Sequence, residues 1–254
     1  MKAAFKRSFR TWLIPVLLFA MLEWYTRTIG ASSDALASPS NAALAWWRAV
    51  MDGSLLSSTA FTLGTAAFGL SLALLLGLVF GLLLGLSHRA SGFGFLTIEV
   101  LRPIPSVALI PIAMLIFGFG VRFEASVVAF ACTWPLLVQT QAAVRQIDPQ
   151  LLELAANLEM GMWARIKNIL LPALVPRFFV ALRLAIAIAL VVAVTVEIAA
   201  NPYGMGYALM LSQQSLAPDA MLAWLLWIGV VGFVLNSLTL KLQGLINRRM
   251  GAIA

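Results

Sequence analysis

Long apolar segments separated by short polar ones make up most of this chain. Several of these segments approach or exceed the ~20 residues that a helix needs to cross the hydrocarbon core of a bilayer. A membrane β-barrel would instead show segments of ~10 residues in which apolar and polar positions alternate. The pattern therefore predicts an all-α integral membrane protein with six spanning helices, at about 11–29, 58–86, 97–118, 124–143, 176–198 and 221–243.

The segments between the predicted spans differ in character. Residues 30–57 are rich in Ser, Ala and Pro and include two tryptophans, which favours an extramembrane loop with a short interfacial helix. Ser87-His88-Arg89 predicts a short polar turn, and residues 199–220 predict a loop. Three prolines, Pro103, Pro105 and Pro111, break the third predicted span.

The composition agrees with a membrane protein and excludes other classes. Of 254 residues, 62% are hydrophobic and only 11% are charged, whereas soluble domains are roughly 45–50% apolar and about 25% charged. Cys132 and His88 are the only cysteine and the only histidine, so we expect no disulfide framework, no metal site and no catalytic site. One transmembrane domain is expected to cover residues 1–254.

The basic residues predict the orientation in the membrane. If the N-terminus is cytoplasmic, all 17 Lys and Arg residues except Arg27, Arg48 and Arg122 lie on or border the cytoplasmic side, as the positive-inside rule requires. The basic N-terminus followed by an apolar run also resembles a secretory signal. The small-residue pair Ala35 and Ala37 lies well past that run, so we expect an uncleaved first span and two cytoplasmic termini.

The longest polar insertion, residues 144–174, is then cytoplasmic. Asp148-Pro149 is typical of a helix start, and Gly161 can end that helix. An apolar face is expected because four residues fall at helical spacing: Leu151, Leu154, Ala155 and Leu158. Such a helix can lie in the lipid headgroup layer or press its apolar face into a groove on a partner protein, and the residues alone leave both open.

Three motifs resemble a known family. Glu153-x-Ala155, Trp163 and Leu171-Pro172 resemble the EAA loop of ABC importer membrane subunits. The segments 101–111 and 117–120, and 196–198 with 204–207, resemble the nitrate, sulfonate and taurine branch of that family. The family's loop glycine would fall at Glu159, whereas the nearest glycine is Gly161. Either the turn is shifted or the loop fits an unusual partner.

The resemblance implies a fold, partners and residue roles. The chain would be the permease of a type I ABC importer of the inner membrane, working as a homodimer with two ABC ATPase subunits and an extracytoplasmic substrate-binding protein. ATP and Mg would bind the ATPases, because this chain has no phosphate-binding loop and no cofactor of its own. The segment Asp148–Gly161 would be the helix that couples to the ATPase. The coupling residues, which include two beyond this segment, would be Leu151, Glu153, Leu154, Ala155, Leu158, Gly161, Leu171 and Pro172.

Other residues are candidates for the pathway or for helix packing. Polar groups within or beside spans can mark solute pathways, which selects Arg102, Glu197, Thr133, Gln139 and Thr195. The alternative for Glu197 is an interfacial carboxylate bonded to the adjacent loop, and for Arg102 a snorkelling side chain that positions the third span. The threonines and the glutamine can instead form helix–helix hydrogen bonds. Gly77, Gly81 and Gly85 form a small-residue stripe that lets another helix approach closely. The expected solute is a small anion such as a sulfonate, taurine or nitrate-like compound.

Two other classes compete with an importer subunit. A self-sufficient secondary transporter or channel would show more spans, internal repeats or a polar pore motif. An intramembrane enzyme would need a nucleophile with a base, an acid pair or zinc ligands. The sequence shows none of these features, and we expect no nucleic-acid partner, only membrane lipid and the other subunits.

Overall fold

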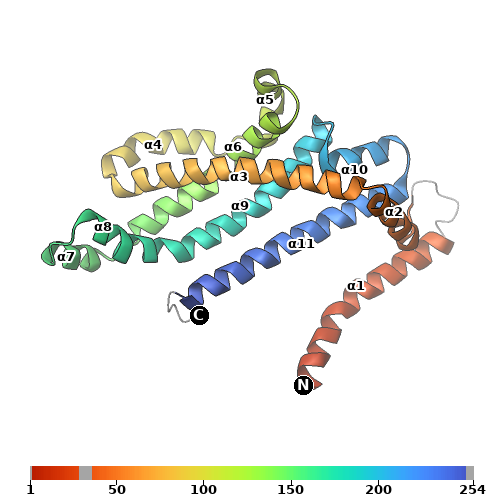
Figure 1. Cartoon of the computed structure of the whole chain (residues 1–254), viewed down its shortest axis with the longest axis horizontal. Helices are drawn as coiled ribbons and strands as arrows, with labels where there is room; N and C mark the ends of the chain where they lie inside the picture. Colours follow the sequence, from red (N-terminus) through yellow and green to blue (C-terminus); the bar gives the residue numbers. More distant parts are fainter. Residues whose placement is uncertain (1, 29–35, 250–254) are drawn as a thin grey trace.

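A computed structural model describes residues 2–28 and 36–249, and every element in these two ranges is helical. Long helices run along the molecule, α7 and α8 lie at one end, and α2 and α10 lie at the other (Figure 1). The helices are α1 (Lys2–Thr28), α2 (Pro39–Met51), α3 (Ser54–Leu86), α4 (His88–Leu101), η1 (Ser106–Leu109), α5 (Ile110–Phe117), α6 (Val121–Arg145), α7 (Pro149–Asn157), α8 (Met162–Arg165), η2 (Ile166–Leu170), α9 (Leu171–Ala199), α10 (Gly204–Gln214) and α11 (Pro218–Arg249).

Four helices in the described ranges are long and apolar enough to cross a membrane: Ser54–Leu86, Val121–Arg145, Leu174–Ala199 and Pro218–Ile246. They correspond to the predicted second, fourth, fifth and sixth spans. The predicted first span lies mostly within α1, and its last residue, 29, lies outside the described residues.

The predicted third span differs from the structure. Residues 88–117 form two helical segments that meet at an angle of 84°. The bend follows Leu101, where Pro103 and Pro105 lack the backbone N–H groups that would continue the helix. The predicted turn at Ser87-His88-Arg89 is shorter in the structure. Only Ser87 separates α3 from α4, and its hydroxyl caps α4 by accepting from the Ala90 backbone N–H at 3.2 Å.

The predicted loop at 199–220 contains a helix of 11 residues, α10. The sequence shows little amphipathic pattern there, because glycines and polar residues interrupt the apolar positions. Tertiary contacts stabilise the helix instead, since Gly204, Met205 and Gly206 at its start are buried among α3 and α9.

Helices α3 and α6 pack closely along a line of small residues. Gly69, Ala73, Gly77, Gly81 and Gly85 follow one another at intervals of four residues on α3. A Cβ atom on Gly77 would lie 2.6 Å from the Cβ of Leu136, and one on Gly81 or Gly85 would meet α6 as closely. The stripe therefore faces a helix of the same chain, and it extends two positions beyond the three glycines selected from the sequence.

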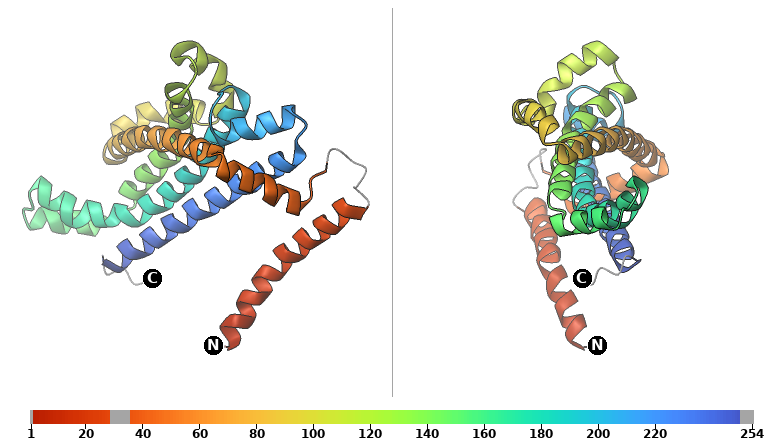
Figure 2. Two further views of the ribbon diagram at one scale, coloured as in Figure 1. Left: turned by 45° about the vertical axis from the view of Figure 1, so that its right-hand side comes forward. Right: turned by 90° about the vertical axis from the view of Figure 1, so that its left-hand side faces the viewer.

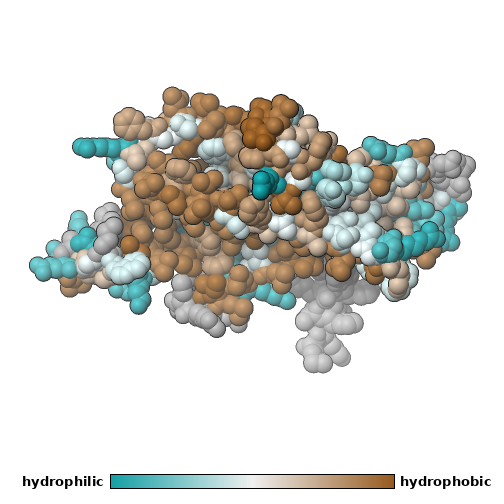
Figure 3. All heavy atoms as spheres, turned by 45° about the horizontal axis from the view of Figure 1, so that its top comes forward, coloured by the Kyte–Doolittle hydropathy of each residue, from teal (hydrophilic) through white to brown (hydrophobic). Residues whose placement is uncertain are grey.

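The core of the bundle lies between α3, α6 and α9, where small side chains such as Ala181, Ala185 and Ala189 meet larger ones from α6. The outer surface is largely apolar, whereas that of a soluble protein is largely polar. Figure 3 shows apolar side chains across the middle of the molecule and hydrophilic ones mainly toward its ends. This distribution matches a protein whose middle faces lipid.

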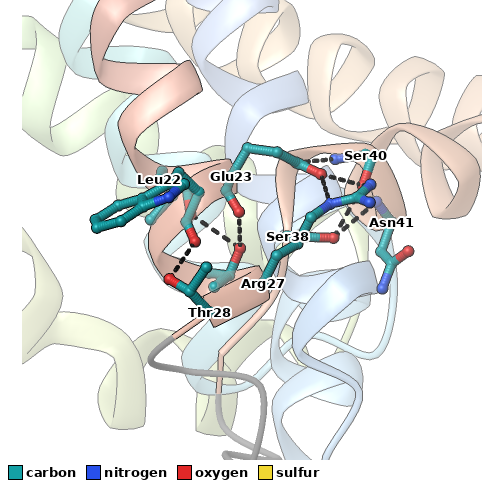
Figure 4. Close-up of polar contacts among 9 residues, drawn as sticks. Leu22, Glu23, Arg27, Thr28, Ser38, Ser40 and Asn41 are labelled. Carbon is teal, nitrogen blue, oxygen red and sulfur yellow. Dashed lines mark hydrogen bonds and ion pairs between the residues drawn. The ribbon is translucent and has the colours of Figure 1, made fainter.

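Helix α1 stands apart from the other long helices in both views of Figure 2 and contacts α2. Polar side chains hold this junction together (Figure 4). The Glu23 carboxylate pairs with Arg27 and accepts from the Ser40 backbone N–H at 3.0 Å and the Ser40 hydroxyl at 2.8 Å. The Ser38 hydroxyl caps α2 by accepting from the Asn41 backbone N–H at 3.2 Å. The junction fixes where α1 leaves the bundle.

Candidate functional site

A buried polar cluster lies where α3, α6, α9 and α10 meet. Its two carboxyl groups belong to Glu124, in the first turn of α6, and Glu197, near the end of α9, and both residues are 0% exposed. Thr62, Thr65 and Asn201 complete the cluster and are at most 1% exposed. Polar groups in such surroundings are costly unless they are hydrogen-bonded, so their partners determine what the cluster can do.

Glu124 is bonded through both carboxyl oxygens. The Thr65 hydroxyl of α3 donates to Oε1, and the Asn201 side-chain amide, from the segment after α9, donates to Oε2 at 2.6 Å. The carboxyl group thus links three elements that are distant in the sequence. Removing one partner would leave a buried oxygen without its donor.

Glu197 is held by the start of α10. Its Oε2 accepts from the Gly206 backbone N–H at 2.8 Å, and the Met205 N–H next to it donates to the Thr62 hydroxyl at 2.9 Å. Gly204 has φ +92° and lies so close that a Cβ atom there would collide with the Glu197 carboxyl group. Only glycine fits this position, both for its backbone conformation and for the space available.

Two oxygen atoms of the cluster lack a hydrogen-bond partner within the described ranges: Oε1 of Glu197 and Oδ1 of Asn201. Both residues also line a cavity of about 290 Å³, together with Phe119, Tyr207 and Met210. Oε1 of Glu197 packs against Gly204, and both residues are at most 1% exposed, so the fold encloses these two acceptors beside the cavity. No group of three or more His, Cys, Asp or Glu residues in the described part of the chain could hold a metal ion.

The other pathway candidates lie apart from this cluster. Arg102 caps the end of α4 on the exposed side of the bend. The hydroxyl groups of Thr133 and Thr195 donate to their own helices, to the carbonyl oxygens of Ala129 and Val191 at 2.7 Å each. Gln139 is half-buried on α6. Of the five candidates, the structure places only Glu197 in the buried cluster.

Sequence reasoning missed Glu124 and gave Asn201 no role. The sequence pattern places Glu124 at the start of the predicted fourth span and Asn201 in the predicted loop 199–220. The available signal was an acidic residue beside the Gly-rich turn 118–120, at the edge of an apolar run. Its partners could not be inferred, because Thr65, Glu124 and Asn201 meet only in the folded chain.

A second candidate site is α7, in the polar insertion. The Asp148 carboxylate accepts from the Gln150 backbone N–H at 2.9 Å, as expected at a helix start. Leu151, Leu154 and Leu158 are 45%, 53% and 63% exposed. Glu153, Gly161, Leu171 and Pro172 are exposed as well.

The predicted apolar face of α7 is divided in the structure. Ala155 is 0% exposed, whereas the three leucines are exposed. A surface for a partner would therefore consist of Leu151, Leu154 and Leu158, which we call the leucine stripe.

The end of α7 differs from the prediction at Gly161. The helix ends at Asn157 and Glu159 has φ +49°, a left-handed conformation. The Met160 N–H donates to the Ala155 carbonyl at 3.0 Å, which is the bond of a Schellman helix end with Glu159 at the position that favours glycine. The turn is therefore not shifted to Gly161, because the helix end stays at the family's glycine position with Glu159 in place of glycine.

We expect Glu159→Gly to stabilise this turn by about 1 kcal/mol, because a side chain disfavours the left-handed conformation. Hydrogen exchange of the Met160 amide should slow about five-fold. Gly161→Ala is the matched control: a Cβ atom there has nothing within 4 Å, and exchange should stay unchanged. Faster exchange in Glu159→Gly would contradict the assigned turn.

Known proteins resemble this chain in sequence and in fold. The model of a family described as binding-protein-dependent transport system inner membrane component matches residues 73–252. A protein of Bacillus subtilis named as a candidate aliphatic sulfonates transport permease is 28% identical over 91% of this chain and 86% of its own length. The bicarbonate transport system permease of Synechococcus elongatus is 30% identical over 80% of this chain and 73% of its own.

A third relative, the taurine transport system permease of Escherichia coli, is 26% identical over 73% of this chain and 68% of its own length. Among solved structures, a chain of the inward-facing MetNI methionine ABC transporter has a similar fold. The TM-score is 0.62 at 16% identity, and the match covers 73% of this chain and 92% of that one.

Proposed function

The chain belongs to the family of binding-protein-dependent transport system inner membrane components, and we propose that it forms the membrane pathway for a small anionic solute. The sequence-based identification of an ABC importer permease of the nitrate, sulfonate and taurine branch is confirmed by the family match and the relatives. The observation that carries the proposal is this match over residues 73–252, which includes the whole polar insertion with α7.

The chain would cross the membrane six times as a single domain, with both termini in the cytoplasm. Support comes from the four apolar helices and from the bent segment 88–117 as a further crossing. Helix α1 would be the first crossing, although it is not among the helices of the described ranges that are long and apolar enough to cross a membrane. The start of α1 and the end of α11 lie toward the same side of the bundle (Figure 1), as an even number of crossings requires. Most basic residues then lie on the cytoplasmic side.

Helix α7 would seat in a groove of a cytoplasmic ABC ATPase. Its leucine stripe offers apolar surface that water otherwise covers, and the exposed Glu153 offers an acceptor to a basic or backbone group. Pro172 would support the rigid entry into α9, so that movement of α7 is transmitted to a spanning helix. Gly161 has no role in ending α7 but remains part of the proposed contact region.

Two copies of the chain, two ATPases and an extracytoplasmic binding protein would make up the importer, with ATP and Mg bound by the ATPases. The buried cluster around Glu197 would then face the outer side, at the opposite end of the bundle from α7. Its unpaired acceptors and adjacent cavity suit a gate that opens or closes on the pathway. The relatives whose names specify sulfonates, bicarbonate and taurine support a small anion as the solute.

The test is to purify the subunit from its native membrane in mild detergent and to identify the proteins that accompany it by mass spectrometry. We expect an ABC ATPase in a ratio of one per permease copy, together with the binding protein under crosslinking. A homo-oligomer without an ATPase would contradict the proposal and favour a secondary transporter, with α7 as a membrane-surface helix.

A further inference from the structure

Arg183 lies inside a membrane-spanning segment. It is nine residues past the start of the apolar stretch Leu174–Ala199, which places it about 14 Å along the helix axis at 1.5 Å per residue. The distribution of Lys and Arg residues along the sequence predicts instead that Arg183 lies at the cytoplasmic border. The guanidinium group therefore belongs to the interior of this apolar stretch and not to the end of the helix.

The partner of Arg183 is neutral. Its Nε donates to Oδ1 of Asn236, in the matching part of α11, at 2.9 Å. No carboxylate in the described ranges lies within ion-pair distance of Arg183. Because a guanidinium group has five N–H donors, the bond to Asn236 orients the group and leaves both terminal nitrogens free to bind something else.

A cavity of about 250 Å³ opens beside this pair, between α9 and α11. The small residues Ala187 and Gly232 make room for the cavity, and the rest of its lining is apolar and includes Ile186 and Leu190. One fixed positive charge in an apolar cavity of this size suits a small oxyanion with or without a short apolar tail.

The charged group lies on a face of α9 that the chain itself leaves uncovered. Arg183, Ala187, Val191 and Thr195 follow at intervals of four residues, and the first three are exposed. Against lipid, an uncompensated guanidinium at this depth would be strongly unfavourable. A water-filled pathway between two copies of the chain would remove that cost.

We infer that the cavity at Arg183 and Asn236 is a mid-membrane binding site for the oxyanion group of the transported solute. Terminal nitrogens of Arg183 bind two oxygens of the anion, and Asn236 is a positioning residue that holds the guanidinium group through Nε. This inference rests on the proposed importer function and adds the group that selects for anions.

The experiment measures ATP-driven uptake into proteoliposomes that contain the complete importer. The probes are labelled ethanesulfonate, taurine, nitrate and bicarbonate. For whichever anion the native protein transports, we expect Arg183→Gln to lower the rate of uptake at saturating binding protein about ten- to a hundred-fold, as expected for loss of a charged hydrogen-bond pair. Arg183→Lys should lose less, because it keeps the charge and loses the two-point geometry.

Asn236→Asp distinguishes a role of the Arg183–Asn236 pair in anion binding from a role in holding α9 and α11 together. The new carboxylate would pair with Arg183 and keep the two helices together, but it would neutralise the charge that the anion needs. We expect normal assembly and the same loss of uptake as in Arg183→Gln. If the pair has only a structural role, Asn236→Asp would transport normally, which would overturn the inference.

Arg177→Gln, six residues earlier on α9, is the matched control and should transport normally. Unchanged uptake in Arg183→Gln overturns the inference, as does the absence of uptake for all four anions by an importer that hydrolyses ATP. If uptake depends on Arg183 only in vesicles that contain anionic phospholipid, Arg183 binds lipid phosphate and the inference is overturned. Failure of the proposed function can be distinguished from these outcomes by co-purification. If the chain is not an importer subunit, no ABC ATPase accompanies it.

Discussion

Replacing Leu154 by Asp is expected to abolish ATP-driven uptake while the permease still inserts and folds. Leu154 is 53% exposed at the centre of the leucine stripe, so the change costs little within the chain itself. In the proposed ATPase groove, it removes a buried leucine, worth about 1.5–3 kcal/mol, and adds an unpaired carboxylate. We expect at least a 100-fold weaker association, measured by co-purification of the ATPase and by uptake in proteoliposomes.

Leu216→Asp is the matched control for this prediction. Leu216 is 87% exposed and lies between α10 and α11, at the opposite end of the bundle from α7. It should leave both ATPase binding and uptake at the native level. Normal uptake in Leu154→Asp would contradict the coupling role of α7, whereas loss of uptake in both variants would point to a general effect of surface charge.

Gly81→Leu is expected to break the packing of α3 on α6. A Cβ atom at this position would lie 2.6 Å from the Cβ of Thr140 and 2.8 Å from the backbone oxygen of Leu137, and backbone atoms cannot move aside as a flexible side chain can. Overpacking at such a contact costs about 3 kcal/mol or more. We expect a large loss of folded protein and, in what remains, an apparent Tm lower by about 5 °C or more.

The control lies on the same helix. Gly64 has nothing within 4 Å of an added Cβ atom, so Gly64→Leu should leave yield and Tm close to native values. Because the stripe contacts α6 of the same chain, Gly81→Leu should lower Tm even at concentrations where the permease is monomeric. A native Tm in Gly81→Leu, measured by thermal unfolding in detergent, would contradict the described α3–α6 contact.

Several features of the protein could be read from local patterns in the chain. The long apolar helices follow from hydrophobicity alone, since the bilayer requires each span to bond its own backbone. The start of α7 at Asp148-Pro149 and the bend after Leu101 at Pro103 and Pro105 follow from capping and from the missing N–H groups of proline. These effects act within a few residues, so the sequence displays them directly.

Other features depended on residues that meet only after folding. Glu159 takes the left-handed turn although Gly161 is nearby, and the Met160 N–H closes the helix end on the Ala155 carbonyl. Helix α10 forms without a clear pattern because Gly204 and Gly206 let it approach Glu197. The partners of Glu124 and of Arg183 likewise come from packing between helices.

Local patterns in the chain thus specify the fold class, the family and the position of the polar insertion, because hydrophobic length and short motifs are local properties. The tertiary structure alone decided which polar groups are buried together and which surfaces remain uncovered. It divided the predicted face of α7 into a buried alanine and an exposed leucine stripe, and it placed Asn236 against Arg183 across 53 residues of sequence. Such pairings depend on how spanning helices pack against one another, and apolar segments in lipid all carry the same hydrophobic signal.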